Sequence, residues 1–153
     1  MLNISWDPVL IAISYLVAFI ASFVALDSAG KIPPSSRKAA LFWRIAGGVT
    51  LGIGIWSMHF IGMLSMQMPM MMSYDLWLTL ASLGVAVIAS TTALDIAVAG
   101  KKRSLFRPIV ATAILSAGVV SMHYIGMAAL MLDGSIIWDR RIVGLSVVIA
   151  VVA

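Results

Sequence analysis

Five long apolar stretches constrain this chain more than any other feature of its sequence. They cover residues 8–29, 41–66, 76–99, 108–132 and 142–153. The first four reach the roughly 20 residues that a helix needs to cross a bilayer, and the fifth stops at the last residue. Short segments rich in proline, glycine, serine and charge separate them, which is typical of turns.

The composition excludes a water-soluble domain. Of 153 residues, 62% are hydrophobic and only 10% are charged, whereas soluble domains carry roughly 25% charged residues. A soluble protein of this length could not bury so much apolar surface in one core. The sequence therefore predicts an all-α integral membrane protein, a multi-pass helical bundle with four complete transmembrane helices and a truncated fifth.

The basic residues lie mainly on one side of the predicted membrane. Arg140 and Arg141 fall on one side, and the other eight fall on the opposite side: Lys31, Arg37, Lys38, Arg44, Lys101, Lys102, Arg103 and Arg107. Because cytoplasmic segments carry an excess of lysine and arginine, we expect segments 31–40 and 100–107 to be cytoplasmic. The N-terminus and segments 66–73 and 133–139 then face outward.

The sequence repeats itself. Segments 14–27 and 82–95 are identical at nine of fourteen positions, and both end in Ala-Leu-Asp. An aromatic-Asp pair precedes three of the apolar stretches, as Trp6-Asp7, Tyr74-Asp75 and Trp138-Asp139. The unit is a two-helix hairpin, so successive units share one orientation and are parallel repeats. We place the units at about 6–68, 74–132 and 138–153, and we interpret the chain as a truncated piece of a longer protein.

Both histidines of the chain lie in near-copies of one heptapeptide, SMHFIGM at 57–63 and SMHYIGM at 121–127. Residues four apart share a helix face, so each histidine should lie beside the methionine that follows it by four. Both copies have glycine three residues after the histidine, at Gly62 and Gly126, which predicts close approach of a neighbouring helix on that face.

The heptapeptides supply six candidate metal ligands: Met58, His59, Met63, Met122, His123 and Met127. Imidazole is a common ligand and thioether is soft, so such a site selects Cu(I) over hard cations. Copper is favoured over zinc because the chain has no cysteine, and a haem with His or Met axial ligands is the second possibility. The competing interpretation is structural, because intramembrane histidines are often only hydrogen-bonded and methionine fills irregular packing.

A single shared centre is the arrangement that we expect for the two copies. One helix offers only one histidine and two methionines, whereas soft copper accepts three or four ligands. We therefore predict that His59 and His123 face a common space, within about 10 Å of each other given helix axes 8–10 Å apart. Met63 and Met127 should belong to the same cluster. The methionine-rich segment 66–72 is either an outer metal-collecting loop or an interfacial segment.

All six acidic residues are aspartates at predicted helix ends. Three precede helices, where a carboxylate caps free N–H groups: Asp7, Asp75 and Asp139. Asp27 can reach Lys31 one turn later, and Lys101 or Lys102 follows Asp95. We expect ion pairing at these two positions, and proton or ion handling is the alternative.

The two heptapeptides resemble the signature of the MHYT domain, a bacterial integral membrane sensor domain, and the likeness covers essentially the whole chain. The resemblance implies about seven membrane helices with three motifs near the outer face, in the bacterial inner membrane. It also implies a copper site that senses oxygen, carbon monoxide or nitric oxide, with the six candidate residues above as its ligands. Family members are joined to cytoplasmic output domains: cyclic-di-GMP enzymes, histidine kinases or DNA-binding regulators.

The chain departs from the family pattern at two points. Phe60 stands where the family motif has tyrosine, so the first copy has no phenol. The third motif is absent, so a site that needs three histidines would be incomplete.

We therefore expect a membrane sensor, with copper handling or transport as the alternative. A polar path from the histidines to Asp27 or Asp95 would favour transport, and an output domain beyond residue 153 would favour the sensor. The chain has no glutamate, cysteine or phosphate-binding loop, so we expect neither enzymatic activity nor direct binding of nucleic acid.

The charge asymmetry makes the topology testable. Cysteine introduced at Ser35 should resist an impermeant thiol reagent in intact cells, because the 31–40 segment is expected in the cytoplasm. Cysteine at Ser73 should react. The reverse labelling pattern would invert the orientation and place both heptapeptides on the inner side.

Overall fold

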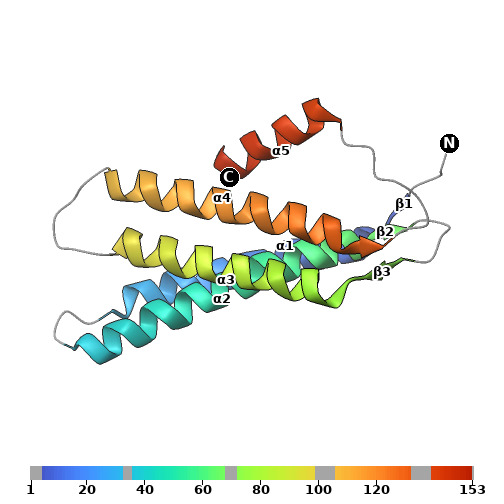
Figure 1. The fold of residues 1–153 in the computed structure, drawn as a ribbon. Coiled ribbons are helices and arrows are strands. Elements are labelled where there is room, and N and C mark those ends of the chain that lie inside the picture. The colour runs from blue at the N-terminus through green and yellow to red at the C-terminus, as the bar shows by residue number, and fades with distance from the viewer. Residues whose placement is uncertain (1–4, 33–35, 68–71, 99–105, 132–138, 153) are drawn as a thin grey trace.

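Five helices dominate the part of the chain that the computed structural model describes, residues 5–32, 36–67, 72–98, 106–131 and 139–152. They are α1 (Pro8–Gly30), α2 (Arg37–Leu64), α3 (Leu76–Val98), α4 (Phe106–Ala129) and α5 (Arg140–Val152), and Figure 1 shows their arrangement. The first four are long and apolar enough to cross a membrane. The predicted all-α membrane bundle is confirmed.

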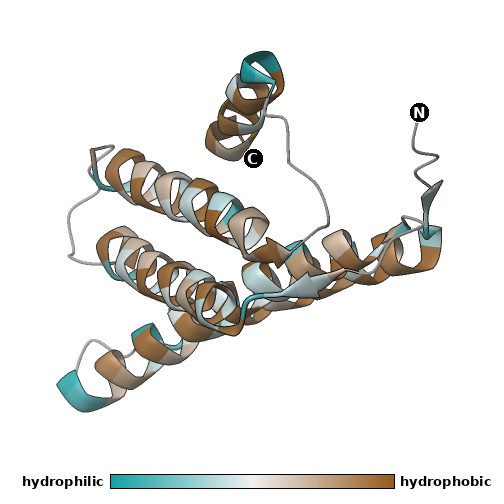
Figure 2. Cartoon of the chain, turned by 45° about the vertical axis from the view of Figure 1, so that its right-hand side comes forward, coloured by the Kyte–Doolittle hydropathy of each residue, from teal (hydrophilic) through white to brown (hydrophobic). Residues whose placement is uncertain are grey.

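The surface of the bundle is made of large apolar side chains. Phe19 is 70% exposed and Trp77 is 77% exposed, whereas buried positions of α1 hold small residues such as Ala21 and Ala25. Figure 2 shows hydrophobic residues along the whole length of the helices and strongly hydrophilic ones at the starts of α2 and α5. This distribution suits helices that meet lipid on the outside and one another through small residues.

Aspartates begin three of the helices, as the sequence predicts. The Asp7 carboxylate accepts hydrogen bonds from the backbone N–H groups of Val9 and Leu10. Asp75 accepts from Leu78 N–H at 2.8 Å, and Asp139 accepts from Arg141 N–H at 2.8 Å. Each carboxylate satisfies donors that the first helical turn leaves unpaired, so the capping role is confirmed.

Two short antiparallel strand pairs close the hairpins, and the sequence analysis missed them. β1 (Ser5–Trp6) pairs with β2 (Met66–Gln67), and β3 (Ser73–Tyr74) pairs with β4 (Leu130–Met131). The second helix of each hairpin therefore ends at Leu64 or Ala129, so the expected helical ends at 66 and 132 were wrong. Strands of two residues carry no detectable alternation of apolar and polar residues.

The helices of one hairpin meet at an equivalent point in both hairpins. A Cβ added to Gly54 of α2 would lie 2.1 Å from the Cβ of Ala21 in α1. A Cβ added to Gly118 of α4 would lie 2.2 Å from the Cβ of Ala89 in α3. Glycine is thus required at these two positions, because any side chain there would separate the two helices.

The two hairpins meet through α2, which packs against both α1 and α3. Gly48 and Gly52 lie four residues apart on the face of α2 toward α3. A Cβ at Gly48 would lie 2.4 Å from the Cα of Thr91, and one at Gly52 would lie 2.5 Å from the Cα of Val87. This is the small-xxx-small contact that brings transmembrane helices together at backbone distance.

The end of the bundle opposite the strands carries two ion pairs. Asp27 of α1 pairs with Lys31, the residue that follows the helix, as predicted. Asp95 pairs instead with Arg44 of α2 at 2.9 Å, and the expected partners Lys101 and Lys102 lie outside the described residues. The Arg44 pair forms because α2 packs against α3, a contact that sequence spacing cannot reveal.

Figure 1 shows that the ends of α1 and α3 and the starts of α2 and α4 lie at one end of the bundle, and the strands at the other. The described basic residues near that end are Lys31, Arg37, Lys38, Arg44 and Arg107, in keeping with the predicted asymmetry. Ser35 of the labelling test lies outside the described residues. Both heptapeptides lie in the strand-side halves of α2 and α4.

The glycine contacts of α2 predict how the hairpins can be separated. Gly52→Ala should lower the free energy of unfolding by about 1–3 kcal/mol through overpacking, because its Cβ would meet the backbone of α3. The matched control is Gly84→Ala, since a Cβ there meets nothing within 4 Å. Thermal unfolding in detergent measures both, and equal midpoints would show that α2 and α3 are not in close contact.

Candidate functional site

The two histidines meet at the centre of the candidate site. The Nδ1 atoms of His59 in α2 and His123 in α4 lie 3.4 Å apart. Their ring centroids are 4.9 Å apart with an interplanar angle of 72°, an edge-on arrangement. The prediction that the two imidazoles share a common space is confirmed.

The glycines of the two heptapeptides play different parts. A Cβ at Gly126 would lie 2.7 Å from Nε2 of His59, so the His59 ring occupies the space that this glycine leaves. A Cβ at Gly62 would meet nothing within 4 Å, so the expected close helix contact at Gly62 was wrong. The two copies differ because Gly62 borders an open pocket and none of the described helices covers it.

Of the two ring nitrogens of His59, only Nδ1 faces the space between the two histidine rings. The Nε2 atom is buried against Gly126 and has no hydrogen-bond partner among the described residues. Nδ1 is therefore the His59 atom that faces His123 and any ligand held between the rings. A hydrogen bond between the two Nδ1 atoms requires one ring to carry its proton there and the other to present a lone pair.

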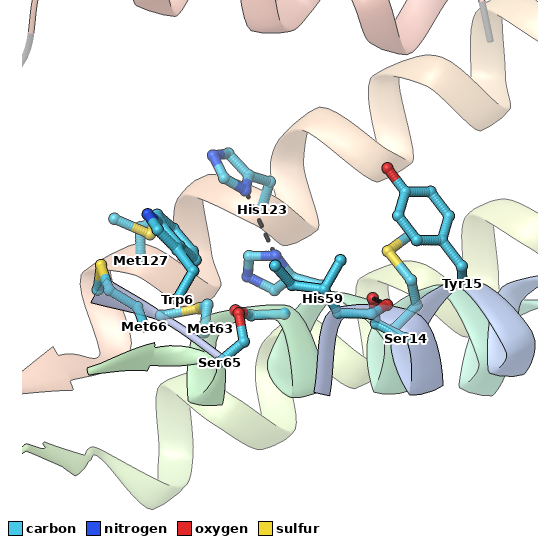
Figure 3. Close-up of a pocket in the computed structure, with 12 residues that line it drawn as sticks. Trp6, Ser14, Tyr15, His59, Met63, Ser65, Met66, His123 and Met127 are labelled. Carbon is cyan, nitrogen blue, oxygen red and sulfur yellow. Dashed lines mark hydrogen bonds between the residues drawn. The ribbon is translucent and has the colours of Figure 1, made fainter. Parts of the chain in front are cut away.

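A pocket of about 430 Å³ lies beside the histidine pair. Its lining comes from α1, α2 and α4 and from the strand segments that flank them. Figure 3 shows Met63, Met66 and Met127 beside Trp6 on one side of the histidines, with Ser14 and Tyr15 on the other. The full lining is Trp6, Ile11, Ser14, Tyr15, Met58, His59, Gly62, Met63, Ser65, Met66, His123 and Met127.

Five of the six predicted ligands line this pocket: Met58, His59, Met63, His123 and Met127. Met122 does not. It is 1% exposed and lines a second pocket of about 350 Å³, which Met58 and both histidines also border. Met127 follows His123 by four residues and shares its helix face, whereas Met122 immediately precedes His123 and points to a different side of α4.

The α1 side of the pocket was not foreseen. Trp6, Ser14 and Tyr15 border the histidines, although the sequence analysis treated segment 14–27 only as a marker of the repeat. A signal was present in that repeat, because equivalent serines recur at Ser82 and Ser146. Of the methionine-rich segment, Met66 lines the pocket, and Met68, Met70 and Met71 lie outside the described residues.

Aromatic hydrogen bonds tie the motif helices to the helix that follows. Trp56 Nε1–H donates to Ser82 Oγ of α3 at 3.0 Å. The Tyr124 hydroxyl is 2.8 Å from Ser146 Oγ of α5. Phe60 has no phenol, yet its hairpin makes the equivalent bond from Trp56 one turn earlier.

Tyr74 on β3 completes the aromatic group beside the first motif. Its ring centroid is 5.6 Å from that of Phe60, and its hydroxyl is buried without a partner among the described residues. Burial raises the pKa of the Tyr74 phenol, so the hydroxyl stays protonated at physiological pH.

The donor set suits a soft metal ion. Two nitrogens that each lie about 2.0–2.1 Å from one ion at a tetrahedral angle are ~3.4 Å apart, which matches the Nδ1 separation of 3.4 Å. Among the described residues no group of three or more His, Asp, Glu or Cys side chains could hold a metal. Further protein ligands would therefore be thioethers, and these favour Cu(I).

The comparison with protein families gives one match. The model described as "MHYT: Bacterial signalling protein N terminal repeat" matches residues 52–111 and again residues 117–153. The two matched segments begin in α2 and α4, just before the heptapeptides. The family model thus covers both motif helices. No solved structure matches the chain.

Three bacterial signalling proteins are similar to the chain over nearly its whole length. The bifunctional diguanylate cyclase/cyclic di-GMP phosphodiesterase MucR of Pseudomonas aeruginosa is 43% identical over 100% of the chain and 22% of its own length. The cyclic di-GMP phosphodiesterase NbdA of the same organism is 34% identical over 97% of the chain and 19% of its own length. The signaling protein YkoW of Bacillus subtilis is 32% identical over 99% of the chain and 19% of its own length. The chain spans about a fifth of these relatives.

The contact between Gly126 and His59 can be tested with a matched pair of variants. Gly126→Ala should displace the His59 ring, because its Cβ would lie 2.7 Å from Nε2. Gly62→Ala should leave the ring in place. The imidazole ¹⁵N signals of the detergent-solubilised chain, which has only two histidines, report the displacement. Unchanged signals in Gly126→Ala would show that the two helices do not approach here.

Proposed function

The chain belongs to the MHYT family of bacterial signalling proteins, and we propose that it detects a diatomic gas or a redox change through copper held between His59 and His123. The observation that carries this proposal is the Nδ1 separation of 3.4 Å, beside a pocket lined by methionine. The proposed gas is oxygen, carbon monoxide or nitric oxide.

Each side chain has a defined part in this proposal. His59 and His123 would each offer Nδ1 to the ion, and Met63 and Met127 would offer sulfur from the same pocket. Met58 borders both pockets and lies next to His59, and Met122 could contribute only from the second pocket. A copper ion would supply a centre whose preferred coordination depends on its oxidation state and on small ligands.

The histidines connect the two hairpins, which suggests how a signal would leave the site. His59 belongs to the first hairpin and His123 to the second, so a change in their separation must change the packing of α2 against α4. Tyr124 follows His123 and is hydrogen-bonded to Ser146 of α5. Movement of His123 would therefore reach α5 directly, and α5 leads away from the two hairpins.

We propose that the longer protein carries a cytoplasmic output domain. The relatives MucR and NbdA are named as enzymes of cyclic di-GMP, so an output domain acting on cyclic di-GMP has the best support. A histidine kinase or a DNA-binding regulator is the less supported choice. Their activities are not carried over to this chain, which spans about a fifth of them.

The basic end of the bundle supports a cytoplasmic position for the α1–α2 and α3–α4 connections. The N-terminus, the strands and the histidine pocket would then face the outer side of the bacterial inner membrane. A sensor with this orientation would meet its ligand from the outer side or from the lipid.

Copper handling or transport is the alternative, and it has less support. Asp27 and Asp95 are held in ion pairs at the far end of the bundle, with side chains 47% and 53% exposed. Between them and the histidines, the hydroxyls of Ser90 and Thr91 are buried without partners among the described residues. Isolated hydroxyls do not make the continuous polar path that ion movement through a membrane requires.

Copper binding is the direct test. The purified chain should bind Cu(I) under anaerobic, reducing conditions, and either His59→Ala or His123→Ala should weaken binding about tenfold or more, equal to ~1.4 kcal/mol. Met131→Ala is the matched control, because Met131 is 56% exposed and lies outside both pockets.

Two results would contradict the proposal. A chain that binds no copper in the titration or in metal analysis has no such site. Variants that each lose half of the bound copper while the remainder binds with unchanged affinity would show two separate sites.

A further inference from the structure

Three serines occupy equivalent positions in the repeat. Ser14, Ser82 and Ser146 each follow by seven residues the aspartate that caps their helix. Each hydroxyl donates to the backbone carbonyl three residues earlier, at 2.7 Å to Ile11, 2.7 Å to Thr79 and 2.8 Å to Val143. Since the hydroxyl proton is used within the helix, each Oγ is left as an acceptor.

Two of these acceptors receive a donor from the motif helix of the preceding hairpin. Trp56 of α2 donates to Ser82 of α3 at 3.0 Å. Tyr124 of α4 meets Ser146 of α5 at 2.8 Å and must be the donor, because the Ser146 proton already goes to Val143. The aromatic-to-serine bond is therefore the repeated contact by which one hairpin docks on the next.

The third acceptor has no such donor among the described residues. Ser14 on α1 is 7% exposed and lines the 430 Å³ pocket beside His59. Its only hydrogen bond there is the one within α1. α1 thus presents the serine acceptor that α3 and α5 present, and among the described residues no motif helix of another hairpin donates to it.

The two pockets lie on either side of one space beside the histidines, which no described helix fills. Both are bordered by Met58, His59 and His123. The pocket of about 430 Å³ is also lined by Ser14 and Tyr15 of α1. The pocket of about 350 Å³ is also lined by Ser146 of α5. One helix lying between α1 and α5 would fill both.

We propose that this position is taken by the second helix of a third hairpin, which follows α5 in the longer protein. That helix would donate an aromatic N–H or O–H to Ser14 and close a ring of three hairpins around the histidines. The occupant is a helix of the same repeat because the α2–α3 and α4–α5 contacts already show what this face binds. The inference goes beyond the proposed function and requires no metal.

Cysteine labelling can test the closure, because the chain has no cysteine. Tyr15→Cys replaces a side chain that is 73% exposed on the pocket face of α1. The matched control is Leu16→Cys, 56% exposed at the same depth but outside the pocket. Both are labelled with N-ethylmaleimide, with a chelator present, in this 153-residue chain and in the full-length protein with its other cysteines replaced by serine.

Tyr15→Cys should react at least about tenfold more slowly in the full-length protein, and Leu16→Cys should react equally in both. Adding Ser14→Ala to the full-length Tyr15→Cys protein should restore part of the labelling. Equal Tyr15→Cys rates, or a gene product that ends before a third hairpin, would overturn the proposal. Protection that grows with the concentration of the 153-residue chain would overturn it in favour of a second copy. Protection that Ser14→Ala leaves intact would refute the role of Ser14.

Discussion

The close approach of α2 to its two neighbours is the contact on which the rest of the structure depends. In lipid, apolar side chains gain little by meeting one another, so helices associate through tight packing and interhelical hydrogen bonds. Gly54 brings α2 to α1, and Gly48 and Gly52 bring it to the backbone of α3. These three glycines fix the position of α2 between α1 and α3. They thereby fix where His59, seven residues after Gly52, meets His123.

The aromatic-to-serine hydrogen bonds explain how the chain tolerates its departure from the family motif. Phe60 lacks the hydroxyl that Tyr124 uses, and in an apolar surrounding an unpaired serine acceptor would be costly. Trp56 lies one turn before Phe60 on the same face of α2 and supplies an indole N–H to Ser82 instead. The aromatic residue on this face of the motif helix therefore serves as a hydrogen-bond donor to the serine. The donor can stand at the motif position, as Tyr124 does, or one turn earlier, as Trp56 does.

From the sequence, the lengths of the apolar stretches predicted the helices. The repeated motifs predicted the aspartate caps and the contact between the two histidines. Those features depend on local composition or on a pattern that occurs twice. The missed features depend on contacts between distant segments. The strand pairs are too short to have a pattern, and the Arg44–Asp95 pair depends on how α2 lies against α3. Ser14 was read only as part of the repeat, because nothing in one sequence says which helix borders the heptapeptides. The different roles of Gly62 and Gly126 likewise follow from which helix is present on each side.

The histidine pair is formed by one residue from each hairpin, so the distance between the two rings depends on how the hairpins are placed relative to each other. Within a hairpin, the strand pair and the glycine-alanine contact hold the two helices at a fixed separation. Between hairpins near the strand end, the described contacts include the Trp56–Ser82 bond, the packing of Phe60 on Tyr74, the His59 ring against Gly126 and the two imidazoles themselves. A ligand that draws the imidazoles together or separates them must therefore act on the junction between two rigid units. Under the proposed function, a shift at that junction would pass along the helices to the end where Asp27 and Asp95 form their ion pairs.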